Sequence, residues 1–251
     1  MLKASIQESA QNPSCRAEVA YFVGMGPDEL AAQANLVFLP MSIELPFKPP
    51  HPPVLPFFVA PDAGACCRID DAGQHDIQEA WTAKNGCQLL LRPVCPSDVA
   101  KSRSFVRGLS YGSRYFRFGR GDFQFAESEL QGLCDPDPHG CTGFIVLAQT
   151  GVQPVEIAAA RYCIEPDDLN CEFAVVVTDA WQGNGVGRRL MDALIRHARG
   201  RGLKTMYGQI LATNTRMLEF SERLGFGIES SAHGAVVRVV RKSLLGGAVG
   251  A

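Results

Sequence analysis

The chain has 251 residues, which is enough for one large domain or for a domain with an extension. An apolar share of 46% and a charged share of 20% are ordinary for a globular protein, and no run of about 18 apolar residues is present to span a membrane. The net charge of −2 gives no general attraction to nucleic acid or to an anionic membrane. We therefore expect neither as a partner.

The cysteines indicate a reducing environment. There are nine, they are scattered without C-x-x-C spacing, and the vicinal pair Cys66-Cys67 has poor geometry for an ordinary disulfide. We expect mostly buried, reduced thiols and no metal site. The first residues, MLKASIQESAQNP, lack the apolar stretch of a secretory signal, so we expect a cytoplasmic protein.

Residues 1–86 differ from the rest of the chain. Half of the 16 prolines fall between Pro40 and Pro61, and the run at 49–53 excludes a helix interior or a central strand. This segment is expected to be extended, although the apolar residues 54–59 predict some packing. We interpret residues 1–86 as a proline-rich, partly irregular extension draped over the remainder. A docking segment for a partner and plain disorder are the alternatives.

A regular succession of elements begins at Cys87. It predicts a strand at Cys87–Leu91, a helix capped by Ser97-Asp98 and running to Leu109, an aromatic and basic loop or short helix at Tyr111–Gly121, a helical stretch at Phe123–Leu133, and strands at Phe144–Ala148 and Val155–Ile164.

Residues 171–202 then combine a strand, a glycine-rich turn and a basic helix beginning near Val186. The first N–H groups of such a helix lack intrahelical partners, and the helix dipole adds positive charge, so the turn is suited to bind an anion. Gly183, Gly185 and Gly187 allow a phosphate to approach the backbone. A Rossmann fingerprint would need glycine where Arg188 stands, and the Gly-Lys-Ser/Thr of a P-loop is missing.

The remaining elements complete a sheet. We predict a strand at Leu203–Ala212, a helix beginning at Asn214, and a hairpin of Gly227–Glu229 with Val236–Arg241. Helices between strands of this kind predict a mixed α/β (α+β) sheet with helices on its faces.

The pattern Gln182-x-x-Gly185-x-Gly187 resembles the pyrophosphate-binding loop of the GNAT superfamily, the acetyl-CoA-dependent N-acetyltransferases. Asn214 and Leu224-Gly225-Phe226 match the family's last helix, so the resemblance covers residues 87–242. Within the superfamily the chain is most similar to bacterial protein-lysine acetyltransferases that modify acyl-CoA synthetases. That similarity is carried by Leu91-Arg92-Pro93, Ser110-x-x-Ser113-Arg114-Tyr115-x-Arg117-Phe118, Glu172–Val177 and Gly234-x-Val236-Val237-Arg238-Val239-Val240.

The resemblance implies a GNAT-like acyl-CoA N-acyltransferase fold at residues 87–245, followed by a flexible tail at 246–251. It implies that the strands at 171–177 and 203–212 splay apart to admit acetyl-CoA, and that a bulge near Phe173 aims an N–H at the thioester. The contacts to acetyl-CoA implied in this way are Phe173, Val175, Val176, Val177, Gln182, Gly183, Asn184, Gly185, Val186, Gly187, Arg188 and Asn214.

Glu172 is the candidate general base, because an attacking amine must lose a proton and this is the ionisable side chain within the strand beside acetyl-CoA. A salt-bridged glutamate without a catalytic role is the alternative. Many relatives carry, at the position of Ser221, a tyrosine that protonates the leaving CoA thiolate. Serine is a poor acid for this role, and Tyr207 and Tyr162 are distant substitutes for it. Arg188 could supply charge to the phosphates or lie on a solvated helix face.

We therefore predict an enzyme that transfers acetyl from acetyl-CoA to a primary amine, with a protein lysine favoured, by direct attack in a ternary complex. A small-molecule amine acceptor and a non-catalytic acetyl-CoA-binding regulatory module are the alternatives. The basic and aromatic stretch Val99–Gly121 is either a substrate-facing wall or a solvated face over core aromatics. The sequence does not fix the oligomeric state.

Overall fold

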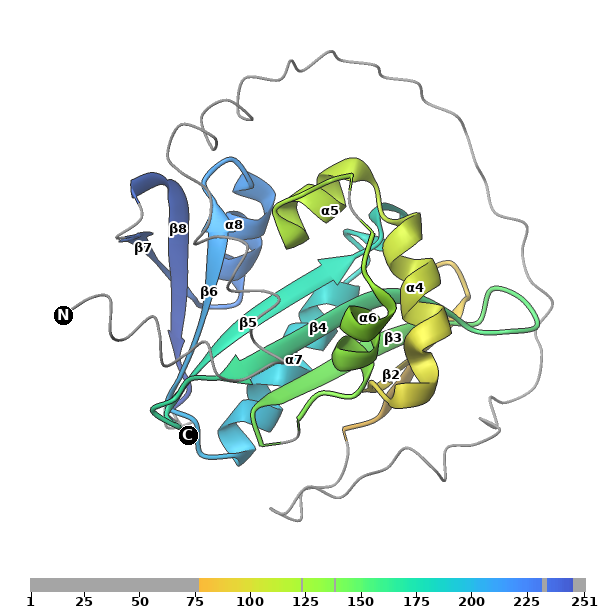
Figure 1. The fold of residues 1–251 in the computed structure, drawn as a ribbon, viewed down its shortest axis with the longest axis horizontal. Helices are drawn as coiled ribbons and strands as arrows, with labels where there is room; N and C mark the ends of the chain where they lie inside the picture. The colour runs from red at the N-terminus through yellow and green to blue at the C-terminus, as the bar shows by residue number, and fades with distance from the viewer. Residues whose placement is uncertain (1–76, 123, 138, 232–233, 246–251) are drawn as a thin grey trace.

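The computed structural model describes residues 77–122, 124–137, 139–231 and 234–245. They form an eight-stranded sheet in the order β1-β2-β3-β4-β5-β6-β8-β7. Figure 1 shows α4, α5 and α6 on one face of the sheet and α7 behind the other. This mixed sheet with helices on both faces confirms the predicted fold class.

The strands are β1 (Glu79–Thr82), β2 (Gln88–Pro93), β3 (Cys141–Ala148), β4 (Val155–Ile164), β5 (Asn170–Val177), β6 (Thr205–Leu211), β7 (Gly227–Ser231) and β8 (Gly234–Ser243). The α-helices are α4 (Val99–Gly108), α5 (Tyr111–Phe118), α6 (Glu127–Cys134), α7 (Val186–Gly200) and α8 (Thr215–Arg223), with 3-10 turns η2 (Pro96–Asp98) and η3 (Asp179–Trp181). Neighbouring strands are antiparallel except β5 and β6, which are parallel.

The ordered sheet begins earlier than residue 87, where the sequence predicted its start. Strand β1 pairs with β2 from Glu79 to Thr82, which adds an antiparallel edge strand. The proline-rich stretch and the tail at 246–251 lie outside the described residues. In the part of the chain that is described, no helix is long and apolar enough to cross a bilayer.

Helix α7 supports the centre of the sheet. Its predicted apolar face is confirmed, because Leu190, Met191, Leu194, Ile195 and Ala198 are all buried. They pack into the main core with residues of β2 to β6. The helix is therefore held rigidly with its N-terminus at the end of β5, where the glycine turn begins.

A disulfide between two strands contradicts the expectation of reduced thiols. Cys141 on β3 and Cys163 on β4 are register partners and form a disulfide with a Cα–Cα distance of 4.2 Å. Cys87, Cys134 and Cys171 are free and buried, as predicted. The expectation was wrong for the bonded pair because strand register, not spacing along the sequence, brings the two side chains together.

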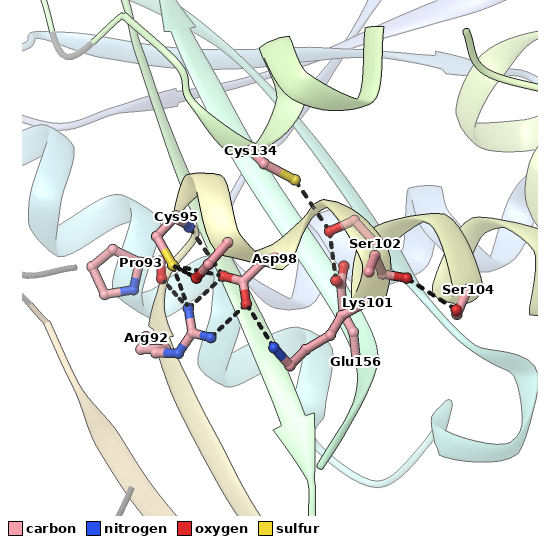
Figure 2. A network of polar contacts seen from close by, with 11 residues as sticks. Arg92, Pro93, Cys95, Asp98, Lys101, Ser102, Ser104, Cys134 and Glu156 are labelled. Atoms are coloured by element: carbon pink, nitrogen blue, oxygen red, sulfur yellow. Dashed lines mark hydrogen bonds and ion pairs between the residues drawn. The ribbon is translucent and has the colours of Figure 1, made fainter. Parts of the chain in front are cut away.

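A buried polar network anchors α4 to the sheet (Figure 2). Asp98 is fully buried, and its carboxylate accepts hydrogen bonds of 2.7 Å from both terminal nitrogens of Arg92 on β2. Burial alone would raise the pKa of Asp98, but the paired Arg92 guanidinium holds it below its ordinary value. Asp98 stands at the helix start as predicted, yet its carboxylate bonds Arg92 and the Cys95 N–H instead of capping the helix.

The same network contains a second buried acid, Glu156 on β4. Its carboxylate accepts a 2.7 Å hydrogen bond from the Ser102 hydroxyl on α4, and the Cys134 thiol donates to the same hydroxyl (Figure 2). Burial raises the pKa of Glu156 to about 8. This carboxyl group therefore holds its proton at neutral pH, in contrast to Asp98.

Candidate functional site

Strands β5 and β6 separate along most of their length. They pair only at Asn170↔Thr205, Cys171↔Met206 and Glu172↔Tyr207. On its other edge β5 stays paired with β4 as far as Val177. Figure 1 shows the two strands diverging from this shared end. Between residues 173 and 177 the β6-facing edge of β5 therefore has no strand partner among the described residues, and main-chain groups there are open to an extended ligand.

The opening arises from strand divergence and not from a bulge. The β4–β5 register runs without interruption from Cys171 to Val177, so the bulge expected near Phe173 is absent. The Phe173 ring is buried beside Phe226, and a Cβ on Gly208 of β6 would come within 2.7 Å of that ring. The Phe173 ring thus fills the core next to the last β5–β6 pair, and Gly208, which has no side chain, leaves room for it.

The neighbouring valines are partly buried against the core. Val175 and Val177 pack against the cluster that includes α7, and Val176 packs against the cluster formed by Phe105, Val106 and Leu109. Val186, the first residue of α7, is buried as well. Contacts from these predicted residues to a ligand would therefore come from their main chain.

The glycine turn leads from η3 to α7. Gly183 and Gly185 have φ of 78° and 81°, the left-handed region that favours glycine. A Cβ on Gly185 would meet no atom within 4 Å, whereas one on Gly187 would lie 3.5 Å from Phe220 and from Val177. Position 185 therefore faces open space. At position 187 the absence of a side chain lets the start of α7 pack closely against Phe220 and Val177.

The turn also presents unused donors. The first recorded hydrogen bond at this helix start runs from the Arg189 N–H to the Gly185 carbonyl, at 3.1 Å. Among the described residues, the N–H groups of positions 183–188 make no close, well-aligned hydrogen bond within the protein. Open space, adjacent N–H groups and a helix N-terminus together fit a phosphate group.

The side chains around the turn hold it in place. Gln182 donates through Nε2 to the Val177 carbonyl at 2.9 Å and accepts from Arg216 Nη1 at 2.7 Å. Asn184 donates to the Gln182 carbonyl at 3.3 Å. Asn214 caps α8 as predicted, accepting from the Met217 N–H at 3.2 Å. Arg216 could not be predicted as a partner of Gln182, because the two residues lie 34 positions apart along the chain.

Arg188, predicted to contact the phosphates, lies in the first turn of α7. Its side chain is 64% exposed and pairs with Asp192 one helical turn further on, at 3.8 Å. The geometry therefore agrees with the alternative of a solvated helix face.

Glu172 lies at the point where β5 and β6 part. It is half-buried, its register partners are Cys163 and Tyr207, and its Oε1 accepts from Gln209 Nε2 at 3.2 Å. The carboxylate thus lies at the closed end of the opening, and the glycine turn lies at the other end.

The candidate acids are poorly suited to protonate a leaving group. The Tyr207 hydroxyl donates to Glu165 at 2.5 Å, and burial, together with the nearby charge of Glu172, raises its pKa. Tyr162 is fully buried against His197, and Ser221 is buried and bonded to the Met217 carbonyl. In the described ranges no three acidic, histidine or cysteine residues are grouped to hold a metal ion.

The stretch Val99–Gly121 is only partly available to a substrate. Arg114 donates to the carbonyls of Leu109 and Gly121, at 2.7 Å and 2.6 Å, and Phe105 lies in the core. The side chains of Tyr111 and Phe116 on α5 are exposed. Phe105 thus belongs to the core and Arg114 bonds the main chain within the stretch, while the exposed rings of α5 form a surface.

Comparison with known proteins identifies related enzymes. The model described as Acetyltransferase (GNAT) family matches residues 110–226. Acetyltransferase PA5475 of Pseudomonas aeruginosa is 32% identical over 154 residues, which are 61% of this chain and 81% of that protein. Acetyltransferase Pat of Mycolicibacterium smegmatis is 30% identical over 143 residues, 57% of this chain but only 42% of that protein.

Solved structures agree on the fold. The GNAT domain of S. lividans PAT superposes with a TM-score of 0.59 at 23% identity, covering 66% of this chain and 96% of that domain. RimL, a ribosomal L7/L12 alpha-N-protein acetyltransferase solved with coenzyme A, gives a TM-score of 0.51 at 14% identity, covering 62% of this chain and 93% of that one.

Proposed function

Because the chain belongs to the GNAT family of acetyltransferases, we propose that this enzyme transfers acetyl from acetyl-CoA to a protein lysine by direct attack in a ternary complex. The observation that carries the proposal is the opening between β5 and β6, which starts at Glu172 and ends at the glycine turn. The motifs shared with bacterial protein-lysine acetyltransferases favour a lysine over a small-molecule amine. A cytoplasmic location fits such a reaction.

In this proposal acetyl-CoA lies along the opening. Its diphosphate contacts the N–H groups of residues 183–188, and its pantetheine arm bonds the main chain of residues 173–177 as an added strand would. Five residues of strand span about 17 Å, so the thioester at the end of the extended arm reaches Glu172. With no bulge present, the oxyanion that forms on the thioester carbonyl is stabilised by a main-chain N–H on the unpaired, β6-facing edge of β5.

Glu172 assists the acceptor amine. A lysine of pKa about 10.4 is cationic at pH 7, and its deprotonation costs roughly 4.6 kcal/mol. The half-buried carboxylate accepts that proton directly or through an ordered water while the nitrogen attacks the thioester carbon. The C–S bond then breaks, and the CoA thiolate leaves without a dedicated acid, since Tyr207 is bonded to Glu165 and Ser221 is buried. The second proton lost by the attacking nitrogen passes to the thiolate or to solvent.

The acceptor class is tested by incubating the purified chain with acetyl-CoA and either a chemically deacetylated bacterial lysate or a panel of free amines and amino acids. CoA release is followed, and acetyl-lysine is detected by antibody and mass spectrometry. We expect new acetyl-lysine in lysate proteins. Turnover restricted to free amines would favour the small-molecule alternative, and no CoA release with any amine would favour the regulatory module.

Replacing Gly185 by alanine is expected to weaken acetyl-CoA binding by about tenfold, because a methyl group would stand where a phosphate approaches. The left-handed backbone at this position also costs an alanine about 1–2 kcal/mol of stability. Gly202→Ala is the matched control, since Gly202 has a φ of 78° and open space but follows the other end of α7. Both variants should lose similar stability in thermal melts. Equal acetyl-CoA affinity in both would contradict the phosphate site.

A further inference from the structure

Arg216 reaches the glycine turn from a different helix. It lies in the first turn of α8, and its Nη1 donates to the side-chain oxygen of Gln182 at 2.7 Å. Its Nη2 lies 3.9 Å from the position that a Cβ on Gly183 would occupy. The guanidinium group therefore borders the same space as the unbonded N–H groups of the turn.

The partner of Arg216 is neutral, which distinguishes it from the other arginines nearby. On α7, Arg188 pairs with Asp192, and both Arg189 and Arg196 pair with Glu79 of β1. On α8, Arg223 pairs with Glu219. In the described part of the chain, Arg216 has no carboxylate within ion-pair distance. Its positive charge is thus left uncompensated beside the turn.

Gln182 fixes the direction of this charge. The amide nitrogen of Gln182 is bonded to the Val177 carbonyl at the end of β5, so its oxygen is turned toward Arg216. One guanidinium edge is occupied by that oxygen, and the remaining N–H groups are available to a ligand. A planar guanidinium held in this way matches two phosphate oxygens at once.

We propose that Arg216, oriented by Gln182, binds the diphosphate of coenzyme A and supplies the side-chain charge that the glycine turn itself lacks. The inference rests on the proposed function, because it assumes that CoA occupies the opening. It assigns to Arg216 the electrostatic role that the sequence suggested for Arg188. Gln182 is then a positioning residue, whose side chain contacts protein and not ligand.

The test is calorimetry on the full chain with CoA and with dephospho-CoA, which retains the diphosphate but lacks the 3′-phosphate. Arg216→Gln is expected to weaken binding of both ligands by the same factor, about 10- to 100-fold. Arg216→Lys should recover part of the loss. Arg223→Gln removes the same charge from the same helix and should bind both ligands as wild type does. In initial-rate assays the KM of Arg216→Gln for acetyl-CoA should rise by a similar factor, whereas Arg223→Gln should keep the wild-type KM.

The outcomes separate this inference from the function on which it rests. Unchanged CoA affinity in Arg216→Gln, with wild type binding normally, overturns the role of Arg216 alone. A loss confined to CoA, with dephospho-CoA unaffected, assigns Arg216 to the 3′-phosphate and overturns the diphosphate contact. Failure of wild type to bind CoA refutes the proposed function itself. Thermal melts without ligand establish that each variant is folded.

Discussion

Glu172→Gln is expected to lower kcat by about 10²- to 10⁴-fold while leaving the affinity for acetyl-CoA unchanged. The amide keeps the size of the carboxylate and can keep the contact with Gln209, but it cannot accept the proton of the attacking ammonium. Initial rates at saturating acetyl-CoA and calorimetry with CoA separate the two effects. The prediction applies to whichever amine the acceptor screen identifies.

The pH profile sharpens this prediction. As pH rises toward the acceptor pKa of about 10.4, more of the amine is already neutral, so the deficit of Glu172→Gln should shrink. Glu219→Gln on the exposed face of α8 is the control for loss of one negative charge and should retain wild-type kcat. Wild-type turnover in Glu172→Gln at pH 7 would exclude this residue as the base. A deficit that stays constant with pH would indicate a structural role.

Glu156→Gln is expected to remove a pH dependence of stability. Burial raises the pKa of Glu156 from 4.5 to about 8, so between these values the folded state keeps a proton that the unfolded state has released. The free energy of unfolding of wild type therefore falls as pH rises through this window, by up to about 1.4 kcal/mol per pH unit, and levels off above it. The glutamine variant cannot ionise and should become the more stable protein near pH 8.

Urea unfolding at several values between pH 5 and pH 8.5 measures this effect. The two proteins are compared by the slope of the free energy of unfolding against pH. A pH-independent loss of stability from placing the amide beside Ser102 does not change that slope. Asp98, Arg92 and Lys101 also act on Glu156, but the lowered pKa of Asp98 confines its own titration to lower pH. Glu219→Gln should follow the wild-type slope. Parallel curves for wild type and Glu156→Gln would show that Glu156 is already ionised in the folded protein.

Local patterns sufficed where neighbours in sequence determine the structure. The apolar face of α7 follows from residues repeating at helical spacing, and the turn follows from glycines that adopt positive φ. The cap at Asn214 is equally local. These features rest on contacts within a few residues, which is why the sequence could predict them.

Features that depend on pairing between distant segments could not be predicted from the residues alone. The Cys141–Cys163 disulfide requires the β3–β4 register, and the contact between Arg216 and Gln182 requires α8 to pack against the turn. The separation of β5 and β6 was expected only from resemblance to a family, and the bulge expected with it is absent. The acid–base roles of the site residues remain predictions that the kinetic experiments address.

Calorimetric titration of the wild-type chain with CoA tests the account most directly, because every proposed role depends on a diphosphate bound by the N–H groups of residues 183–188. We expect saturable binding at one site per chain, with competition by ADP, which carries the same diphosphate. A folded protein that gives no saturable heat with CoA, or that binds CoA equally well with ADP in large excess, would contradict the account.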